Sequence, residues 1–175
     1  MIPVLETERL RIRGHVVADL DAMTAMWGDP EVTRHISGKP STREETWARM
    51  QRYRGMWALL GYGFWLFEEK ATGRFVGEGG LADFKRDMEP RFSEPEHGWA
   101  LAPWAHGQGF ASEAIAAQLA WAEDHFGRVP FVCMIAPENA PSIRLAQKHG
   151  YREFARSPYK GEPSILFRRE PGGSV

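Results

Sequence analysis

The sequence of 175 residues contains a single cysteine, so no disulfide can form within the chain. That residue, Cys133, lies in the apolar run Phe131 to Ile135. We expect a buried core thiol there rather than a catalytic nucleophile. A chain without internal disulfides fits a reducing compartment.

The sequence also lacks an excess of charge of either sign, because 22 lysines and arginines face 23 aspartates and glutamates. Proteins that bind nucleic acids or anionic membranes usually carry a basic excess or a basic stripe. The one dense basic stretch, Arg49 to Arg54, falls in a predicted helix, where a solvated helix face explains it. We therefore expect no nucleic-acid partner.

Long apolar runs and metal-binding patterns are missing too. No run approaches the roughly 20 apolar residues of a membrane span, and charged residues begin a few positions from the N-terminus. We therefore expect no membrane partner and, by default, a cytoplasmic location. The six histidines show no metal-ligand spacing, and no metal is predicted. The composition, 43% hydrophobic and 26% charged, is that of a globular protein, and we expect residues 1–175 to form one domain.

What the sequence does contain is a succession of strand and helix patterns. A capping box at Ser41 and Glu44 predicts the start of a second helix, which carries Met50, Tyr53, Trp57 and Leu60 on one buried face. The order of the patterns predicts a mixed α/β sheet: one strand, two helices, a three-strand meander and then strand-helix units. We expect strands over 10–13, 64–67, 74–81, 96–101, 131–136, 151–155 and 165–169, and helices over 19–27, 41–60, 109–126 and 142–149.

The strongest local motif is the loop His106 to Ala111, between a predicted strand and an alanine-rich helix. The first amides of a helix have no internal acceptors, the helix dipole is positive there, and glycines let a phosphate approach the backbone. The pattern alone also fits a tight turn. A P-loop would continue with Lys and Ser or Thr, but Phe110 follows Gly109, which argues against nucleoside triphosphate hydrolysis.

A dinucleotide-binding fingerprint is an alternative reading of the same loop. Gly107 and Gly109 could be its first two glycines, although Ser112 replaces the third. Glu138, the acid nearest the end of the next predicted strand, lies somewhat too far along the chain. An NAD(P)-dependent oxidoreductase therefore stays open as the second function.

The segments around this loop carry a resemblance to a known family. Glu96 to Leu101 leads through Trp104 into Gly107 to Ala114, and Asn139 to Tyr151 follows as a second motif. In this order they resemble the GNAT acyltransferase superfamily, in particular its RimJ/RimL-like branch; the segments 6–13 and 28–32 are similar as well. The resemblance spans nearly the whole chain. It implies a mixed central sheet flanked by helices, with a strand pair that splays open.

The resemblance also implies a cofactor and the residues that hold it. Acetyl-CoA would be the co-substrate, with its pantetheine arm on the main chain near Trp99 and Leu101. Asn139 and Ser142 would contact the cofactor, and Asn139 can in addition cap the helix 142–149. The pyrophosphate would rest on the loop and helix start formed by His106, Gly107, Gln108, Gly109, Phe110, Ala111 and Ser112.

Two departures from the family pattern bear on catalysis. His106 stands where the superfamily often has arginine or glutamine, and Ala146 stands where many members place a tyrosine that protonates the leaving thiolate. The general acid is therefore unassigned, with Ser142 or water as the candidates.

A base is also needed, because an ammonium has no lone pair with which to attack. Glu78, on the predicted strand 74–81, and Glu96, at the start of the next strand, are the candidates. Alternatively, Glu78 is a paired charge and Glu96 is a strand-edge carboxylate, or the reaction uses no single base. A main-chain amide of a splayed strand would meet the developing oxyanion.

The predicted function is N-acetyl transfer from acetyl-CoA to a primary amine, either a protein or peptide N-terminus or a small amine. A catalytically degenerate protein that binds CoA or a partner is a further alternative, and a homodimer is expected only by resemblance to the family. Trp27, Trp57 and Trp65 could line an acceptor pocket, although packing in the core explains them better.

Overall fold

The computed structural model describes residues 1–172, and they fold around one eight-stranded sheet with the strand order β1-β2-β3-β4-β5-β6-β8-β7. The predicted mixed α/β sheet is thereby confirmed. Two 3-10 helices cover Val17–Asp19 and Pro103–Ala105. The strands are β1 Leu5–Glu6, β2 Leu10–Arg13, β3 Phe64–Glu69, β4 Phe75–Ala82, β5 Glu96–Leu101, β6 Phe131–Ile135, β7 Arg152–Tyr159 and β8 Glu162–Arg169; the helices are α1 Leu20–Trp27, α2 Pro30–Thr33, α3 Arg43–Leu60, α4 Phe110–Phe126 and α5 Ala140–Lys148.

The sheet is weakly joined at one place, between β5 and β6. Within the described residues they form the only parallel pair, and Glu96 opposite Val132 is their only register position. All other neighbouring strands pair antiparallel over longer stretches, apart from the two-residue β1. Beyond Glu96 the two strands separate, which confirms the predicted splayed pair.

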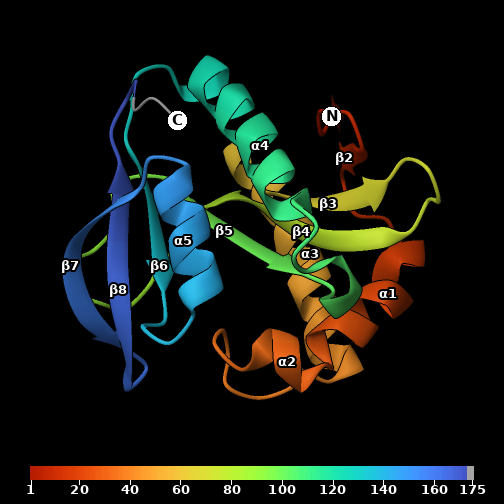
Figure 1. Ribbon diagram of the computed structural model, residues 1–175, viewed down its shortest axis with the longest axis horizontal. Helices are drawn as coiled ribbons and strands as arrows, with labels where there is room; N and C mark the ends of the chain where they lie inside the picture. Colours follow the sequence, from red (N-terminus) through yellow and green to blue (C-terminus); the bar gives the residue numbers. More distant parts are fainter. Residues whose placement is uncertain (173–175) are drawn as a thin grey trace.

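The helices cover the two faces of the sheet as two groups. The first group, α1 to α3, packs on the face that carries Ala82 and Ala100, and α4 and α5 pack on the face that carries Leu81. Figure 1 shows α4 and α5 in front of the sheet and α3 behind it. Since side chains alternate along a strand, neighbouring residues of β4 and β5 face opposite helix groups.

Close approach of β4 to β5 depends on glycine. A Cβ atom at Gly77 would lie 2.4 Å from the carbonyl oxygen of Ala100 and 2.9 Å from the Cα of Leu101. Both are backbone atoms, which cannot swing aside as a flexible side chain can. Gly77 therefore permits the close spacing of β4 and β5 next to the opening between β5 and β6.

Several predicted boundaries are wrong by a few residues. The capping box of α3 is formed by Thr42 and Glu45, not by Ser41 and Glu44, because the Thr42 hydroxyl accepts from the Glu45 amide. Leu60, predicted on the buried face of this helix, is 37% exposed because it lies in the last turn. The patterns also missed the one-turn helix α2 and the full length of the β7–β8 hairpin.

The remaining core predictions hold. Cys133 is buried, and this burial raises the pKa of its thiol well above the ordinary value. Trp27, Trp57 and Trp65 are buried in the core clusters. None of the helices within residues 1–172 combines the length and the apolar character needed to cross a membrane.

Candidate active site

The glycine loop leads directly into α4, as predicted. Gly107 and Gly109 have φ angles of 71° and 82°, in the left-handed region that favours glycine. Gly109 is the N-cap of α4, and no side chain within residues 1–172 caps this helix start. The amides of Phe110, Ala111 and Ser112 therefore lack a side-chain acceptor, which is the arrangement that binds a phosphate at a helix N-terminus.

Arg9 ties this loop to the N-terminal strands. Its Nη1 donates to the carbonyl oxygen of Gln108 at 2.8 Å, and its Nε donates to Glu113 Oε2 at 2.7 Å. Its guanidinium also lies 4.4 Å from the centre of the Phe110 ring. Nothing in the local sequence pattern points to Arg9, because its loop partner is 99 positions away.

Glu113 is the anchor of that contact. Burial favours its neutral form, but hydrogen bonds from Thr7 Oγ1, the Arg9 amide and the Arg9 side chain hold its pKa below the ordinary value. The carboxylate is therefore charged and engaged with the N-terminal segment. It leaves the amides at the start of α4 free of a competing acceptor from their own first turn.

Two histidines flank the same loop. His106 Nε2 lies 3.0 Å from the carbonyl oxygen of Leu101, and its Nδ1 lies 3.8 Å from Glu31 Oε1. His149, at the end of α5, places Nε2 3.0 Å from the hydroxyl of Ser112, and burial lowers its pKa. The end of β5, the start of α4 and the end of α5 therefore meet around residues 106–112.

The main chain of β5 faces the opening between β5 and β6 at the predicted positions. The Ala102 amide donates to the Val76 carbonyl at 2.9 Å, and hydrogen-bonded and non-hydrogen-bonded positions alternate along an antiparallel pair. Trp99 and Leu101 occupy the alternate positions, opposite Gly79 and Gly77, so their amides point away from β4 toward β6. A pantetheine arm could hydrogen-bond there.

The start of α5 lies across from this edge. Asn139 Oδ1 accepts from the Ser142 amide at 3.3 Å, which confirms the predicted cap. The Ser142 hydroxyl in turn accepts from Trp99 Nε1 at 3.3 Å. The structure thus brings together three residues predicted from separate motifs, Trp99, Asn139 and Ser142. Ala146 is fully buried in the core and offers no acid.

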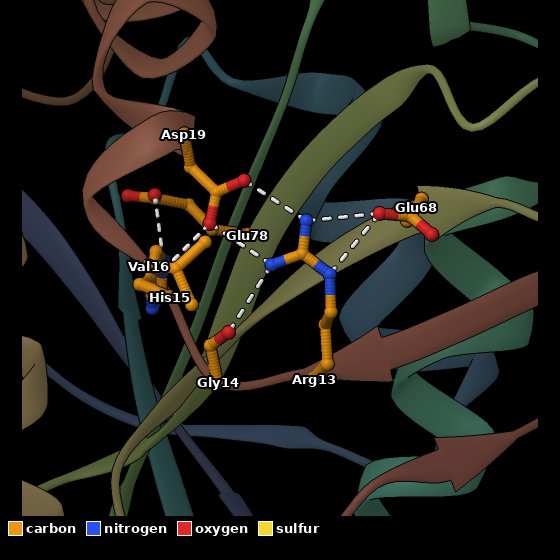
Figure 2. A network of polar contacts seen from close by, with 7 residues as sticks. All are labelled: Arg13, Gly14, His15, Val16, Asp19, Glu68 and Glu78. Carbon is orange, nitrogen blue, oxygen red and sulfur yellow. Dashed lines mark hydrogen bonds and ion pairs between the residues drawn. The ribbon is translucent and has the colours of Figure 1, made fainter.

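Glu78 lies on the other face, under α1 and α3. It is fully buried; its Oε1 accepts from Trp27 Nε1 at 2.8 Å, and its Oε2 lies 3.2 Å from His15 Nε2. The sequence pattern does not indicate the pairing of His15 with Glu78. Figure 2 shows the His15–Glu78 contact as a dashed line to the left of Arg13.

The segment that carries His15 is held by an adjacent ionic network (Figure 2). Arg13 donates to both oxygens of Asp19 at 2.9 Å and to Glu68 at 2.9 and 3.1 Å. Asp19 also accepts from the Val16 amide at 2.7 Å. These bonds fix the chain on both sides of His15.

Glu96 has a different environment at the closed end of the splay. Arg86 binds both of its oxygens at 2.7 Å, and the pair is largely buried. A bidentate guanidinium stabilises the charged carboxylate and occupies its acceptor positions. The structure does not bring Glu78 and Glu96 together, since Glu78 is opposite Ala100 and Glu96 is opposite Ala82 along the β4–β5 pair.

His97 is fully buried on the α4 and α5 face, next to the splay. Its Nδ1 lies 2.8 Å from the Tyr151 hydroxyl and its Nε2 lies 2.9 Å from Gln118 Oε1. Burial lowers its pKa from 6.5 to about 4, despite the hydrogen bond to Gln118. This network connects β5 to α4 and to the start of β7.

We expect that low pKa to make stability depend on pH. In the unfolded chain His97 takes up a proton near its ordinary pKa of 6.5, whereas in the folded protein its pKa is about 4. The free energy of unfolding therefore falls as pH decreases through this window, by roughly 3 kcal/mol at its lower end. Denaturant unfolding of wild type and His97→Gln at a series of pH values measures this, because other titrating groups are shared. Parallel stability curves would contradict the expectation.

Comparison with known proteins agrees with this geometry. The family described as acetyltransferase (GNAT) domain matches residues 9–152. The uncharacterized protein YkkB of Bacillus subtilis (strain 168) is 32% identical over an alignment of length 174, and the match covers 95% of this chain and 95% of that protein. An acetyltransferase structure from Agrobacterium tumefaciens str. C58 is 27% identical, has a TM-score of 0.83, and is matched over 97% of this chain and 95% of that chain.

A more distant structure shows the same fold. RimL, the ribosomal L7/L12 alpha-N-protein acetyltransferase in complex with coenzyme A, is 16% identical with a TM-score of 0.74, over 98% of this chain and all of that chain. At this identity the likeness concerns the fold alone. The family match spans most of the chain, including the glycine loop, the splayed strands and the Asn139 segment. The chain therefore belongs to the GNAT family of acetyltransferases, in its RimJ/RimL-like branch.

Proposed function

We propose that this GNAT N-acetyltransferase moves an acetyl group from acetyl-CoA to a primary amine, on a peptide N-terminus or a small molecule. The observation that carries the proposal is the uncapped start of α4, placed beside the opening between β5 and β6. The family uses acetyl-CoA, and the exposed loop at residues 106–109 offers glycines with left-handed backbone where a pyrophosphate would bind. Family membership overturns the dinucleotide-dependent oxidoreductase as an alternative.

Two groups of residues would hold the cofactor. The amides of residues 110–112 would bind the pyrophosphate, and the amides of Trp99 and Leu101 would bind the pantetheine. His106 already donates to the Leu101 carbonyl, so the Leu101 amide is the group left for the ligand. When bound, acetyl-CoA supplies a thioester carbonyl that an amine can attack.

In the proposed reaction the amine nitrogen forms a bond to the carbonyl carbon, the carbon–sulfur bond breaks, the amine loses a proton and the thiolate gains one. Ser142 is the proposed acid, because its hydroxyl lies beside Trp99 at the edge of the splay. An amide of β5 would donate to the developing oxyanion.

Of the two candidate bases, Glu78 is favoured over Glu96. Both oxygens of Glu96 are occupied by hydrogen bonds from the Arg86 guanidinium, whereas Glu78 contacts Trp27 and His15. Since the Glu78 side chain has no exposed surface, the proton must reach it through water or a neighbouring group.

Calorimetric titration with acetyl-CoA, CoA and NADP, followed by mass spectrometry of peptide and small-amine acceptors, tests this proposal. We expect binding of both CoA compounds, no binding of NADP, and acetylation on nitrogen. A correctly folded protein that fails to bind acetyl-CoA would sink the proposal. RimL acts on a protein N-terminus, which makes peptides with free N-termini the first acceptors to try.

A further inference from the structure

A cavity of about 300 Å³ lies between the segment 37–41 and the first half of α3. Its charged lining consists of Lys39, Arg49 and Arg52, with Glu45 as the one acidic residue. This volume is at the lower end for a small-ligand site and suits one functional group of a ligand. The basic stretch 49–54, which the sequence favours as a solvated helix face, therefore contributes two guanidinium groups to a cavity.

The positive charge of this cavity is not neutralised by the protein. Within residues 1–172, none of Lys39, Arg49 and Arg52 forms an ion pair with a carboxylate. Glu45 does not compensate, because its Oε2 accepts from the Thr42 amide in the capping box.

A second cavity, of about 270 Å³ in the β4–β5 loop, shows the contrast. Its three basic residues are all paired, Lys85 with Asp83, Arg86 with Glu96, and Arg91 with Glu89. The two cavities therefore differ in whether their cations are paired.

Arg49 is held in place by the core rather than by an anion. Its guanidinium lies 3.7 Å from the centre of the Trp27 ring, and Trp27 in turn donates to Glu78. Its Nε is buried and has no hydrogen-bond partner within the described residues. A guanidinium held in this way can bind an anionic oxygen without first being ordered.

Ring contacts connect the cavity to the splayed strand. The Arg52 guanidinium lies 5.5 Å from the ring centre of Phe84 and 5.7 Å from that of Tyr53. Tyr53 stacks on Phe64 at 4.5 Å, and Phe64 Cζ lies 2.9 Å from the place where a Cβ of Gly98 would be. Gly98 precedes Trp99 in β5, so side-chain contacts lead from the cavity to the strand of the proposed reaction centre.

We propose that this cavity binds a carboxylate of the acceptor, so that the enzyme acetylates amines that also carry an acidic group. The inference rests on the proposed function, because it places the acceptor amine over β5. Arg49 and Arg52 bind the carboxylate, Lys39 adds long-range attraction, and the amine then lies toward Gly98. The carboxylate can belong to a small amino acid or to an acidic residue near a peptide N-terminus.

The test compares matched acceptors that differ only in charge: a short peptide with aspartate or asparagine in the second position, and an amino acid or its amide. We expect kcat/KM to be about tenfold higher for each acidic member, mainly through a lower KM. Arg49→Gln and Arg52→Gln should each reduce this preference severalfold, and Arg49→Lys should restore part of it. Arg54→Gln, on the same helix but outside the cavity lining, is the matched control and should keep the full preference.

The outcomes separate this inference from the proposed function. Acetylation of acidic and neutral acceptors at equal rates, or a preference that survives in the Arg49→Gln/Arg52→Gln double variant, would overturn the carboxylate site alone. A stronger preference for a phosphoserine peptide would overturn the assignment to carboxylate. Absence of any amine acetylation by protein that binds acetyl-CoA would instead contradict the proposed function. Thermal melting of each variant checks folding, and Arg52→Gln, at an exposed position, keeps the test valid if Arg49→Gln unfolds.

Discussion

Replacing Gly109 by valine is expected to weaken acetyl-CoA binding by about 100-fold, close to 2.7 kcal/mol. Gly109 has a φ of 82°, a conformation that a β-branched residue adopts only at high cost. The new side chain would also lie at the α4 N-terminus, where the phosphate is proposed to approach the amides. Titration calorimetry with acetyl-CoA measures the change.

The control for this experiment is Gly127→Val at the opposite end of α4. Gly127 has a φ of 73°, and within residues 1–172 no atom beyond its own turn of chain lies within 4 Å of the position that a Cβ would take, so the substitution imposes backbone strain without a steric clash. It should lower thermal stability while leaving the affinity for acetyl-CoA unchanged. Similar losses of affinity in both variants would mean that α4 as a whole, and not its N-terminus, governs binding.

Glu78→Gln is expected to lower kcat about 100-fold while leaving acetyl-CoA affinity nearly unchanged. The amide has the same shape and can still accept from Trp27, but it cannot take a proton from the amine. The deficit should be greatest at low pH and should shrink as the amine begins to lose its proton to solvent. Profiles of kcat against pH for wild type and variant, both checked for folding, measure this.

Glu96→Gln is the matched carboxylate control. It breaks the bidentate pair with Arg86, so it should reduce stability more than it reduces kcat. If the pH-dependent loss occurred in Glu96→Gln and not in Glu78→Gln, the proposed assignment of the base would be reversed. Equal activity of both variants with wild type at every pH would rule out a carboxylate base.

The local geometry of the proposed cofactor site was largely predictable because its signals are local. Left-handed glycines before a helix, an asparagine cap and a strand that ends shortly before Pro103 are each encoded within a few residues. The order of the two family motifs then indicated which strands separate. In the structure, β5 and β6 share a single register position and then separate.

The parts that could not be predicted come from pairs distant in sequence. The contact of Arg9 with Gln108 and that of His15 with Glu78 depend on how the sheet is assembled, and no periodicity records them. The cap of α3 shows the limit at short range. Ser41 and Glu44 have the same spacing as Thr42 and Glu45, so spacing alone does not distinguish the two pairs.

The single bridge between Glu96 and Val132 links ligand binding to folding. Strands β1 to β5 lie on one side of the opening in the sheet, and β6 to β8 lie on the other. Most main-chain groups on the facing edges of β5 and β6 lack a strand partner within the described residues. A pantetheine arm bound between β5 and β6 would supply the missing hydrogen bonds and apolar contacts in the native state only. By mass action, acetyl-CoA at about 100 times its dissociation constant would then add about 2.7 kcal/mol to the free energy of unfolding. The supply of CoA in the cell would thus act as a stabiliser of this protein as well as its acetyl donor.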